Sequence, residues 1–251
     1  MEFLQTFNLT ITQWTWIFVA AFLIGFSKTG ISGLLMLVIP ILAVVFGGKE
    51  STGVILPMLI VGDLIAVWYY HQHAEWKDIK KLLLWTLVGL VLGLIVGEFI
   101  NDSQFKTLIA IIVLICLISL VYTEKKGDSL NVPKKLWFYA LTGILVGFTS
   151  MIGNAAGSIL TIYLLALDFK KESFMGTTAW FFLIINLTKL PLQIFVWQNI
   201  SIKNILLACG LIPAIAIGAL VGVVIIKKLN DKIFRYIVIA ITAIASIRLF
   251  M

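Results

Sequence analysis

Long apolar stretches separated by short polar ones make up almost the whole chain. Within each stretch the apolar residues follow one another without the alternation of a barrel strand, so the pattern predicts membrane helices. We therefore predict an all-α polytopic membrane protein. The stretches run over Trp14–Phe26, Ile31–Phe46, Val54–Tyr70, Leu82–Ile100, Leu108–Tyr122, Leu136–Met151, Ala155–Leu167, Thr177–Val196, Ile205–Ile226 and Ile233–Phe250.

The lengths of the stretches divide them into two kinds. A full membrane span takes about 20 apolar residues. Three stretches in each half of the chain meet or approach that length, whereas the first two of each half are shorter and are joined by a few small polar residues. We expect each short pair to form a hairpin or a broken helix that meets near the membrane interior.

The two halves of the chain resemble each other in sequence. GFS at residues 25–27 matches GFT at 147–149, and NDSQFKTLIAII at 101–112 aligns with NDKIFRYIVIAI at 230–241. We predict a duplication, with each repeat built from one broken or hairpin pair and three transmembrane helices. We expect the chain to consist of a first transmembrane repeat over 1–123, a cytoplasmic connector over 124–135 and a second transmembrane repeat over 136–251.

Basic residues indicate how the repeats cross the membrane, because they collect in cytoplasmic loops. If each short pair returns to its own side, thirteen basic residues face one side of the membrane and four face the other. If each pair forms a single span, the split is nine against eight. The first arrangement is favoured. It makes the halves inverted repeats of a multi-pass protein of the cell (inner or plasma) membrane, with both termini outside.

The composition supports the membrane prediction and excludes other classes. Hydrophobic residues make up 61% of the chain, charged residues 12%, and the net charge is +7. Because the basic residues lie between apolar stretches, topology explains the charge and we expect no nucleic-acid partner. Cys116 and Cys209 lie alone within apolar stretches, which favours inert packing over redox chemistry. We expect neither a metal nor a cofactor.

Lys28 lies in the first polar interruption, GFSKTGISGLL at residues 25–35. A cation at membrane depth costs at least about 2.5–3.5 kcal/mol, so it marks a functional position by default. Hydroxyls, glycine N–H groups and helix N-termini around it would complete an anion site. The alternative is a lysine that reaches an interface or pairs with Asp63. The candidate substrate-binding residues here are Ser27, Lys28, Thr29, Gly30 and Ser32.

The second interruption, GFTSMIGNAAGS at residues 147–158, carries no charge. It offers neutral donors, as expected for the other side of one shared pocket. The alternative is packing, since small residues let membrane helices approach closely. The candidate substrate-binding residues here are Thr149, Ser150, Gly153, Asn154 and Ser158.

Three polar residues inside apolar stretches are candidate coupling or ion-pair residues. Asp63 lies in the middle of its stretch, and Asn186 takes the corresponding place in the second half. Asp63 would carry a coupling proton or only neutralise Lys28, and both interpretations stay open. Lys189 has no charged counterpart in the first half; it lies either in the pocket or near a helix end.

Glycines at four-residue spacing form a helix-packing face in the fourth stretch. They are Gly89, Gly93 and Gly97. This face would pack within the chain or in a homodimer, and the sequence leaves both open.

The sequence resembles the sulfite exporter TauE/SafE family of small-anion transporters. Proteins of that family are duplicated, and each half opens with a glycine-rich stretch followed by apolar residues and a proline. Here the first half shows GFSKTGISGLLMLVIP, which ends at Pro40, and the second shows GFTSMIGNAAGSILTIYLL without the proline. The resemblance implies that the cargo is sulfite, thiosulfate or a small organosulfonate, moved across the inner membrane, with protons as a candidate coupling ion.

We therefore expect a secondary transporter that works by alternating access, with a small anionic substrate and the lipid bilayer as its partners. No Walker sequence is present, so an ion gradient would supply the energy. A passive anion channel on the same repeat is the first alternative. An intramembrane enzyme is less favoured, because a serine protease needs an embedded histidine, and His71 and His73 lie at the edge of a stretch.

Overall fold

Helices form all the regular structure of the part of the chain that the computed structural model describes, namely residues 7, 9–30, 35–105, 107–108, 111, 115, 136–228, 230, 233 and 236. No strand occurs among these residues, so the all-α prediction is confirmed. The first half contains α2 (Ile11–Thr29), α3 (Leu35–Phe46), α4 (Gly48–Tyr70), the short 3-10 helix η2 (His71–His73) and α5 (Trp76–Phe99). The second half contains α7 (Leu136–Gly153), α8 (Gly157–Ala166), α9 (Lys171–Leu192), the π-helical turn η4 (Gln193–Trp197), α10 (Ile202–Gly210) and α11 (Ile212–Lys228).

Several of these helices are long and apolar enough to cross a membrane. Within the described residues there are 5 such helices, which are α2, α4, α5, α7 and α9, and α10 with α11 makes a sixth if the bent pair is one span. The chain is therefore a multi-pass membrane protein. The short-pair prediction holds for the second members, since α3 has 12 residues and α8 has 10. The first members, α2 and α7, are longer than the sequence predicted, with 19 and 18 residues.

The predicted stretch Ile205–Ile226 is bent in the structure. It forms α10 and α11, whose axes meet at 51° around Leu211. Pro213, in the first turn of α11, explains the bend. Proline has no N–H to donate to the preceding turn, and its ring clashes with the carbonyl four residues earlier, so a straight helix cannot continue through it.

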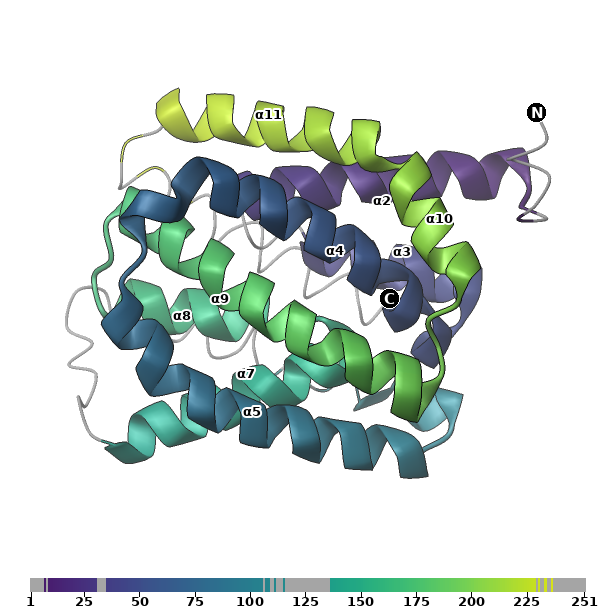
Figure 1. The fold of residues 1–251 in the computed structure, drawn as a ribbon, viewed down its shortest axis with the longest axis horizontal. Helices are drawn as coiled ribbons and strands as arrows, with labels where there is room; N and C mark the ends of the chain where they lie inside the picture. The colour runs from purple at the N-terminus through teal and green to yellow at the C-terminus, as the bar shows by residue number, and fades with distance from the viewer. Residues whose placement is uncertain are drawn as a thin grey trace.

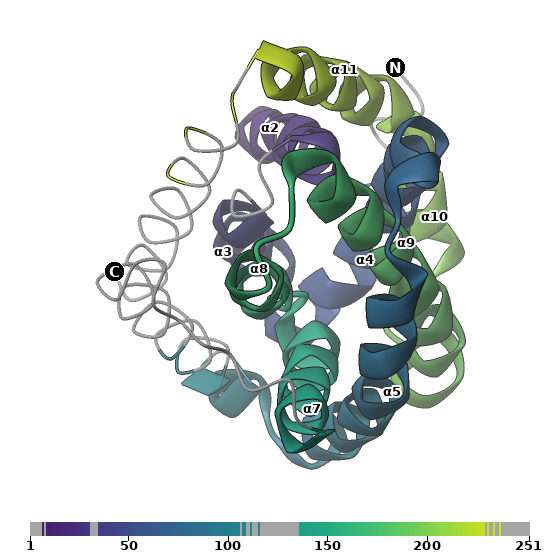
Figure 2. The ribbon, with the colours of Figure 1, turned by 90° about the vertical axis from the view of Figure 1, so that its left-hand side faces the viewer.

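Two helix pairs occupy opposite sides of the bundle (Figures 1 and 2). On one side α2 packs against α11, and on the other side α7 packs against α5. Helices α4 and α9 pack against each other between these pairs. Each first helix of a half therefore packs against a late helix of the other half.

Glycine makes both pair contacts close. A Cβ atom on Gly25 of α2 would lie 1.9 Å from the carbonyl oxygen of Ile215 in α11. A Cβ atom on Gly147 of α7 would lie 2.0 Å from the carbonyl oxygen of Thr86 in α5. Gly25 and Gly147 are matched positions of the two sequence repeats, so the two contacts correspond to each other. Small residues that let helix backbones touch are the usual means of helix association in lipid.

The glycines at four-residue spacing in α5 pack within the chain. A Cβ atom on Gly89 would meet the carbonyl oxygen of Ile144 at 2.1 Å, and one on Gly97 would meet the ring of Trp197 at 2.3 Å. Gly93 lies against Met151. The sequence left open whether these glycines pack within the chain or in a homodimer. Because they pack within the chain, this face of α5 is not available as a homodimer surface.

Helices α4 and α9 run in opposite directions. The start of α9 meets the end of α4, because Gly176 lies against the backbone of Tyr70 and His73. At the far end, the side chain of Lys49, in the first turn of α4, lies 5.1 Å from the ring centroid of Trp197, which follows α9. An inverted relation between the complete halves stays a prediction.

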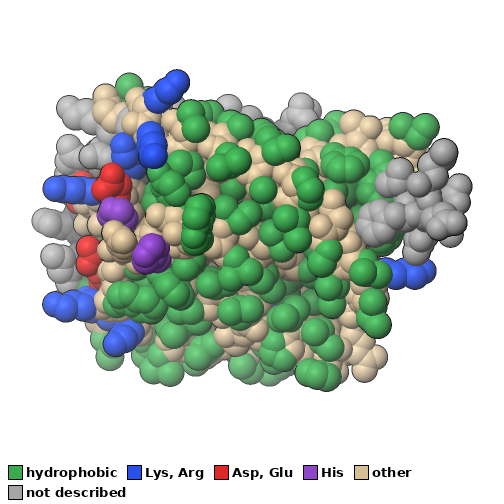
Figure 3. Space-filling view, turned by 45° about the horizontal axis from the view of Figure 1, so that its top comes forward, with side chains coloured by type: hydrophobic (Ala, Val, Ile, Leu, Met, Phe, Trp, Pro, Cys, Tyr) green, Lys and Arg blue, Asp and Glu red, His purple; other side chains and the backbone are tan. Residues whose placement is uncertain are grey.

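Basic side chains collect at the end of the bundle where α4 stops and α9 starts. Figure 3 shows charged and histidine side chains gathered at one end, with apolar side chains covering the middle of that face. Lys49 and Lys203 lie at the other end, near Asn199. The lysines of the lysine-rich end, at the start of α5, the start of α9 and the end of α11, are Lys77, Lys80, Lys81, Lys170, Lys171, Lys227 and Lys228.

Candidate functional site

The first interruption begins later than the sequence predicted. Helix α2 continues through Gly25–Thr29, so Lys28 lies in its last turn, and the N–H of Gly30 closes the helix by donating to the carbonyl of Phe26 at 2.7 Å. The expectation of helix N-termini around Lys28 therefore does not hold for its own helix. A helix C-terminus carries partial negative charge, so α2 stabilises the ammonium group of Lys28.

Lys28 forms a buried ion pair with Asp63 of α4. Its Nζ atom lies 2.7 Å from Asp63 Oδ1, and the two side chains are 6% and 0% exposed. Gly62 makes room for the lysine stem, because a Cβ atom there would lie 3.0 Å from Lys28 Cγ. The Lys28 ammonium also lies 4.6 Å from the ring centroid of Phe182 in α9. The structure thus contains the Lys28–Asp63 pair that was the alternative interpretation of Lys28.

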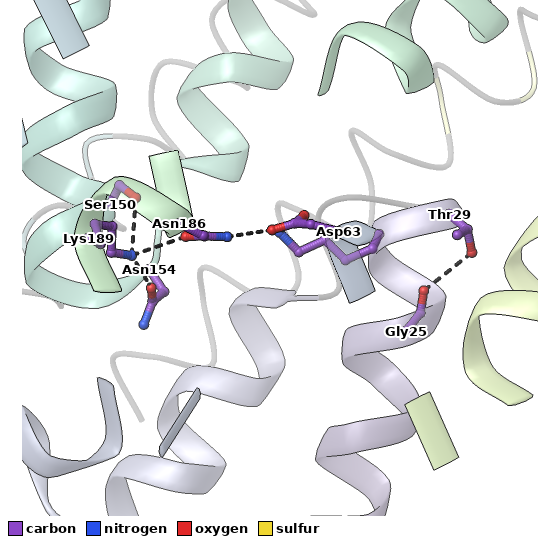
Figure 4. A network of polar contacts seen from close by, with 8 residues as sticks. Gly25, Thr29, Asp63, Ser150, Asn154, Asn186 and Lys189 are labelled. Atoms are coloured by element: carbon purple, nitrogen blue, oxygen red, sulfur yellow. Dashed lines mark hydrogen bonds and ion pairs between the residues drawn. The ribbon is translucent and has the colours of Figure 1, made fainter. Parts of the chain in front are cut away.

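Asn186 joins this pair to a second buried lysine (Figure 4). Its Nδ2 atom donates to Asp63 Oδ2 at 2.6 Å, and its Oδ1 atom accepts from Lys189 Nζ at 3.4 Å. Lys189 is 0% exposed although it lies in the last turn of α9, so its side chain belongs to this buried network and not to the solvent-exposed surface. Asn186 lies fifteen residues after Lys171 and eleven before Trp197, so it is near the middle of the 27-residue span Lys171–Trp197, which is long enough to cross a membrane.

The end of α7 supplies the remaining partners of Lys189. Its Nζ atom donates to Ser150 Oγ at 3.3 Å and to Asn154 Oδ1. Asn154 ends the helix in a left-handed conformation, with φ of 55°, and asparagine adopts that region more readily than most residues. The Nδ2 atom of Asn154 is buried and has no hydrogen-bond partner among the described residues. A buried amide donor without a partner is costly.

The network combines four helices, two from each half. It contains two lysines and one carboxylate, joined by neutral amide and hydroxyl groups. With all three ionised, its net charge is one positive unit. A buried charge without a partner is unfavourable.

Thr29 and Thr149 form hydrogen bonds outside this network. The Thr29 hydroxyl donates to the carbonyl of Ala219 in α11 at 2.6 Å, and the Thr149 hydroxyl donates to Leu145 of its own helix at 2.8 Å. The first bond joins α2 to α11, and the second lies within α7. Ser27 and Gly153 are buried at the ends of α2 and α7. Ser32 and the side chain of Ser158 lie outside what the structure describes.

Sequence reasoning missed two neighbours of Lys28. Phe182 shares a helix face with Asn186 and Lys189, because residues three and four apart in a helix are neighbours. That spacing is a signal that could have identified Phe182. Gly62 precedes Asp63 directly, and only the close approach of Lys28 shows its importance.

The described residues contain no cluster of three or more His, Cys, Asp or Glu side chains that could hold a metal ion. His71 and His73 are exposed at the lysine-rich end.

Comparison with known proteins identifies the family. The model of the family named sulfite exporter TauE/SafE matches residues 17–249, which is nearly the whole chain. No curated protein and no solved structure matches the chain. The proteins of this family are membrane transporters and not enzymes. The chain belongs to the sulfite exporter TauE/SafE family.

Proposed function

We propose that the protein is a secondary transporter of small sulfur-containing anions, namely sulfite, thiosulfate or an organosulfonate, and that the anion binds at the Lys28–Asp63–Asn186–Lys189 network. The observation that carries the proposal is a buried network with two lysines and one carboxylate, in which Lys28 contacts Asp63 directly and Lys189 is joined to it through Asn186. Both lysines are below one-tenth exposed, so bulk water solvates neither side-chain amine.

The anion binds next to Lys189. Its ammonium contacts three neutral oxygens and no carboxylate among the described residues, whereas Lys28 already has Asp63 at 2.7 Å. Ser150 and Asn154 lie beside it with hydroxyl and amide groups that can donate to an oxyanion. Charge-assisted hydrogen bonds to an ionised oxygen are about twice as strong as neutral ones, which favours a small oxyanion over a neutral solute.

Asp63 carries the coupling proton. With a monovalent anion bound, the two lysines, Asp63 and the anion sum to zero charge. A divalent anion leaves one negative charge, which a proton on Asp63 removes. Buried uncompensated charge is avoided, so a divalent anion moves together with a proton and a monovalent anion moves without one.

Alternating access takes place around this network. Support comes from its composition, with α2 and α4 from the first half and α7 and α9 from the second, and from the place of Asn186 near the middle of the 27-residue span Lys171–Trp197. The opposite directions of α4 and α9 support inverted repeats, the architecture in which transporters place their binding sites at the midplane. The lysine-rich end faces the cytoplasm of a cell membrane, both termini lie outside, and the connector 124–135 is cytoplasmic.

Counterflow of labelled sulfite and thiosulfate in proteoliposomes tests the proposal with Lys189→Met. This variant removes the second lysine and leaves the Lys28–Asp63 pair in place. Losing a charged hydrogen-bond donor worth about 1.5–3 kcal/mol lowers the apparent affinity about tenfold or more. Lys203→Met, an exposed lysine of α10, is the matched control, and Lys189→Arg is expected to restore part of the activity.

Trapping in the wild type that disappears in Lys189→Met supports an anion carrier with Lys189 in its site. Undiminished trapping in Lys189→Met, with the protein correctly folded by gel filtration, would remove the lysine from the site. Passage of anion without trapping would indicate a passive channel.

A further inference from the structure

A second set of basic residues surrounds a cavity at the lysine-rich end of the bundle. The cavity has a volume of about 230 Å³. It lies where the end of α4, the start of α9 and the end of α11 meet. The residues that line it are Tyr69, Tyr70, His73, Lys171, Glu172, Ile226 and Lys227. None of them belongs to the buried network.

We propose that this cavity is a second anion-binding site, which holds a small oxyanion between Lys171 and Lys227 at the mouth of the transport route. The proposal rests on the proposed function for the identity of the anion, but the cavity and its two lysines stand independently of the central network.

The charge of the cavity favours an anion. Lys171 and Lys227 approach it from different helices, and Glu172 is the one carboxylate among the lining residues that the structure describes. Glu172 Oε2 lies 3.3 Å from His73 Nε2, so its carboxylate has a partner of its own within the lining. The Lys227 ammonium lies 5.2 Å from the ring centroid of Tyr69, which holds the lysine over the cavity wall. The described part of the lining, with two lysines and one carboxylate, therefore has a net positive charge.

The size of the cavity suits a small oxyanion. One water molecule takes about 30 Å³ in the liquid, so the cavity has room for an anion of a few heavy atoms together with some of its hydration shell. A partly hydrated anion is weakly held, which is appropriate to a site that captures the anion and passes it on.

Tyr70 connects the cavity to the central network. Its ring lines the cavity, and its hydroxyl donates at 3.0 Å to the carbonyl of Thr29, the residue after Lys28. Tyr70 is only 4% exposed and lies between the cavity and the end of α2, with a contact to each. Asp63 lies seven residues earlier in α4, which is about 10 Å along the helix. An anion in the cavity is thus about two helical turns from the Lys28–Asp63 pair.

Two pairs of neighbouring lysines allow a matched test. Lys171→Gln and Lys227→Gln remove cavity lysines, whereas Lys170→Gln and Lys228→Gln remove the adjacent exposed lysines that do not line it. Each of the four variants removes one positive charge from the same end of the bundle. In proteoliposomes we expect Lys171→Gln and Lys227→Gln to raise KM for the anion about three- to tenfold, between the effects of an exposed and a buried ion pair. We expect kcat to stay within twofold of the wild-type value, and the neighbours to change neither constant.

Equilibrium dialysis of radiolabelled thiosulfate against the full chain in nanodiscs separates this proposal from the proposed function. In zwitterionic lipid we expect two bound anions per chain in the wild type. Lys189→Met should remove the central one, and the Lys171→Gln/Lys227→Gln double variant should remove the peripheral one. One anion that is lost only in the double variant would support the cavity and refute the central site. One anion that is lost only in Lys189→Met would overturn the cavity proposal.

A lipid headgroup is the other source of the same chemistry. Repeating the dialysis with phosphatidylglycerol in the nanodiscs distinguishes the two sources. If thiosulfate stays bound in the cavity, as judged by its loss in the Lys171→Gln/Lys227→Gln variant, the cavity is a site for the dissolved anion. Its complete displacement by the anionic lipid would assign the cavity to headgroups and overturn the proposal.

Discussion

Removing Lys28 while keeping Asp63 should destabilise the protein more than removing both charges. In Lys28→Met the Asp63 carboxylate, which is 0% exposed, keeps the Asn186 amide at 2.6 Å as its hydrogen-bond donor but loses the ammonium at 2.7 Å. Breaking a buried ion pair by removing one partner costs about 3–5 kcal/mol. Replacing both partners by neutral groups of similar size is often close to neutral, so Lys28→Met/Asp63→Asn should regain most of this loss.

Thermal unfolding in detergent measures the difference. A change of 1 kcal/mol shifts Tm by about 2–4 °C in a chain of this size, so Lys28→Met should lower Tm by about 6–20 °C. Lys203→Met is the control, because substitution of an exposed residue typically changes stability by no more than about 0.5 kcal/mol. The reasoning fails if Lys28→Met behaves like Lys203→Met. It also fails if the double variant loses the sum of the two single losses, since coupled residues depart from additivity.

Three further outcomes follow from contacts elsewhere in the site and the bundle. Asp63→Asn should abolish the uptake of protons that accompanies divalent anions, and a pH-sensitive dye inside the vesicles checks this; proton uptake equal to that of the wild type would remove Asp63 from coupling. Gly25→Ala should destabilise the α2–α11 contact by about 1–3 kcal/mol, because overpacking forces backbone shifts, and an unchanged Tm would contradict the contact with Ile215. Glu98→Gln should change stability by less than about 1 kcal/mol, because the ion pair with Lys49 is partly exposed, and a large loss of Tm would show that the pair acts as a buried one.

The sequence was a good guide to where polar groups would lie. Lys28, Asp63 and Asn186 are rare residues in apolar stretches, and placing such groups in lipid is costly enough to make each one conspicuous. The glycine spacing in α5 likewise predicted a packing face. Such residues can be recognised from the sequence alone, because the free-energy cost of a polar side chain in the membrane depends mainly on how deep it lies.

The sequence could not show which polar groups meet. Ser150 and Thr149 are adjacent hydroxyl residues, yet Ser150 accepts a bond from Lys189 and Thr149 donates to its own helix. A rotation of one residue, about 100° around the helix axis, separates the two roles, and only the packing of α7 fixes that rotation. The position of Lys189 was undecided for the same reason, since burial depends on which face of α9 meets α4. The bend at Leu211 follows from Pro213, a signal that the apolar run concealed.

The crossed pairing of α2 with α11 and of α7 with α5 has a consequence for how the chain can be divided. A cut in the connector 124–135 would separate α2 from α11 and α5 from α7. Each fragment would then expose two helix faces that are packed through glycine in the intact protein, those of α2 and α5 in one fragment and those of α7 and α11 in the other. Neither fragment would bury these surfaces alone, so each should be a substrate for membrane proteases when it is produced singly. Produced together, the fragments should protect each other, and a functional transporter assembled from two polypeptides would be the result.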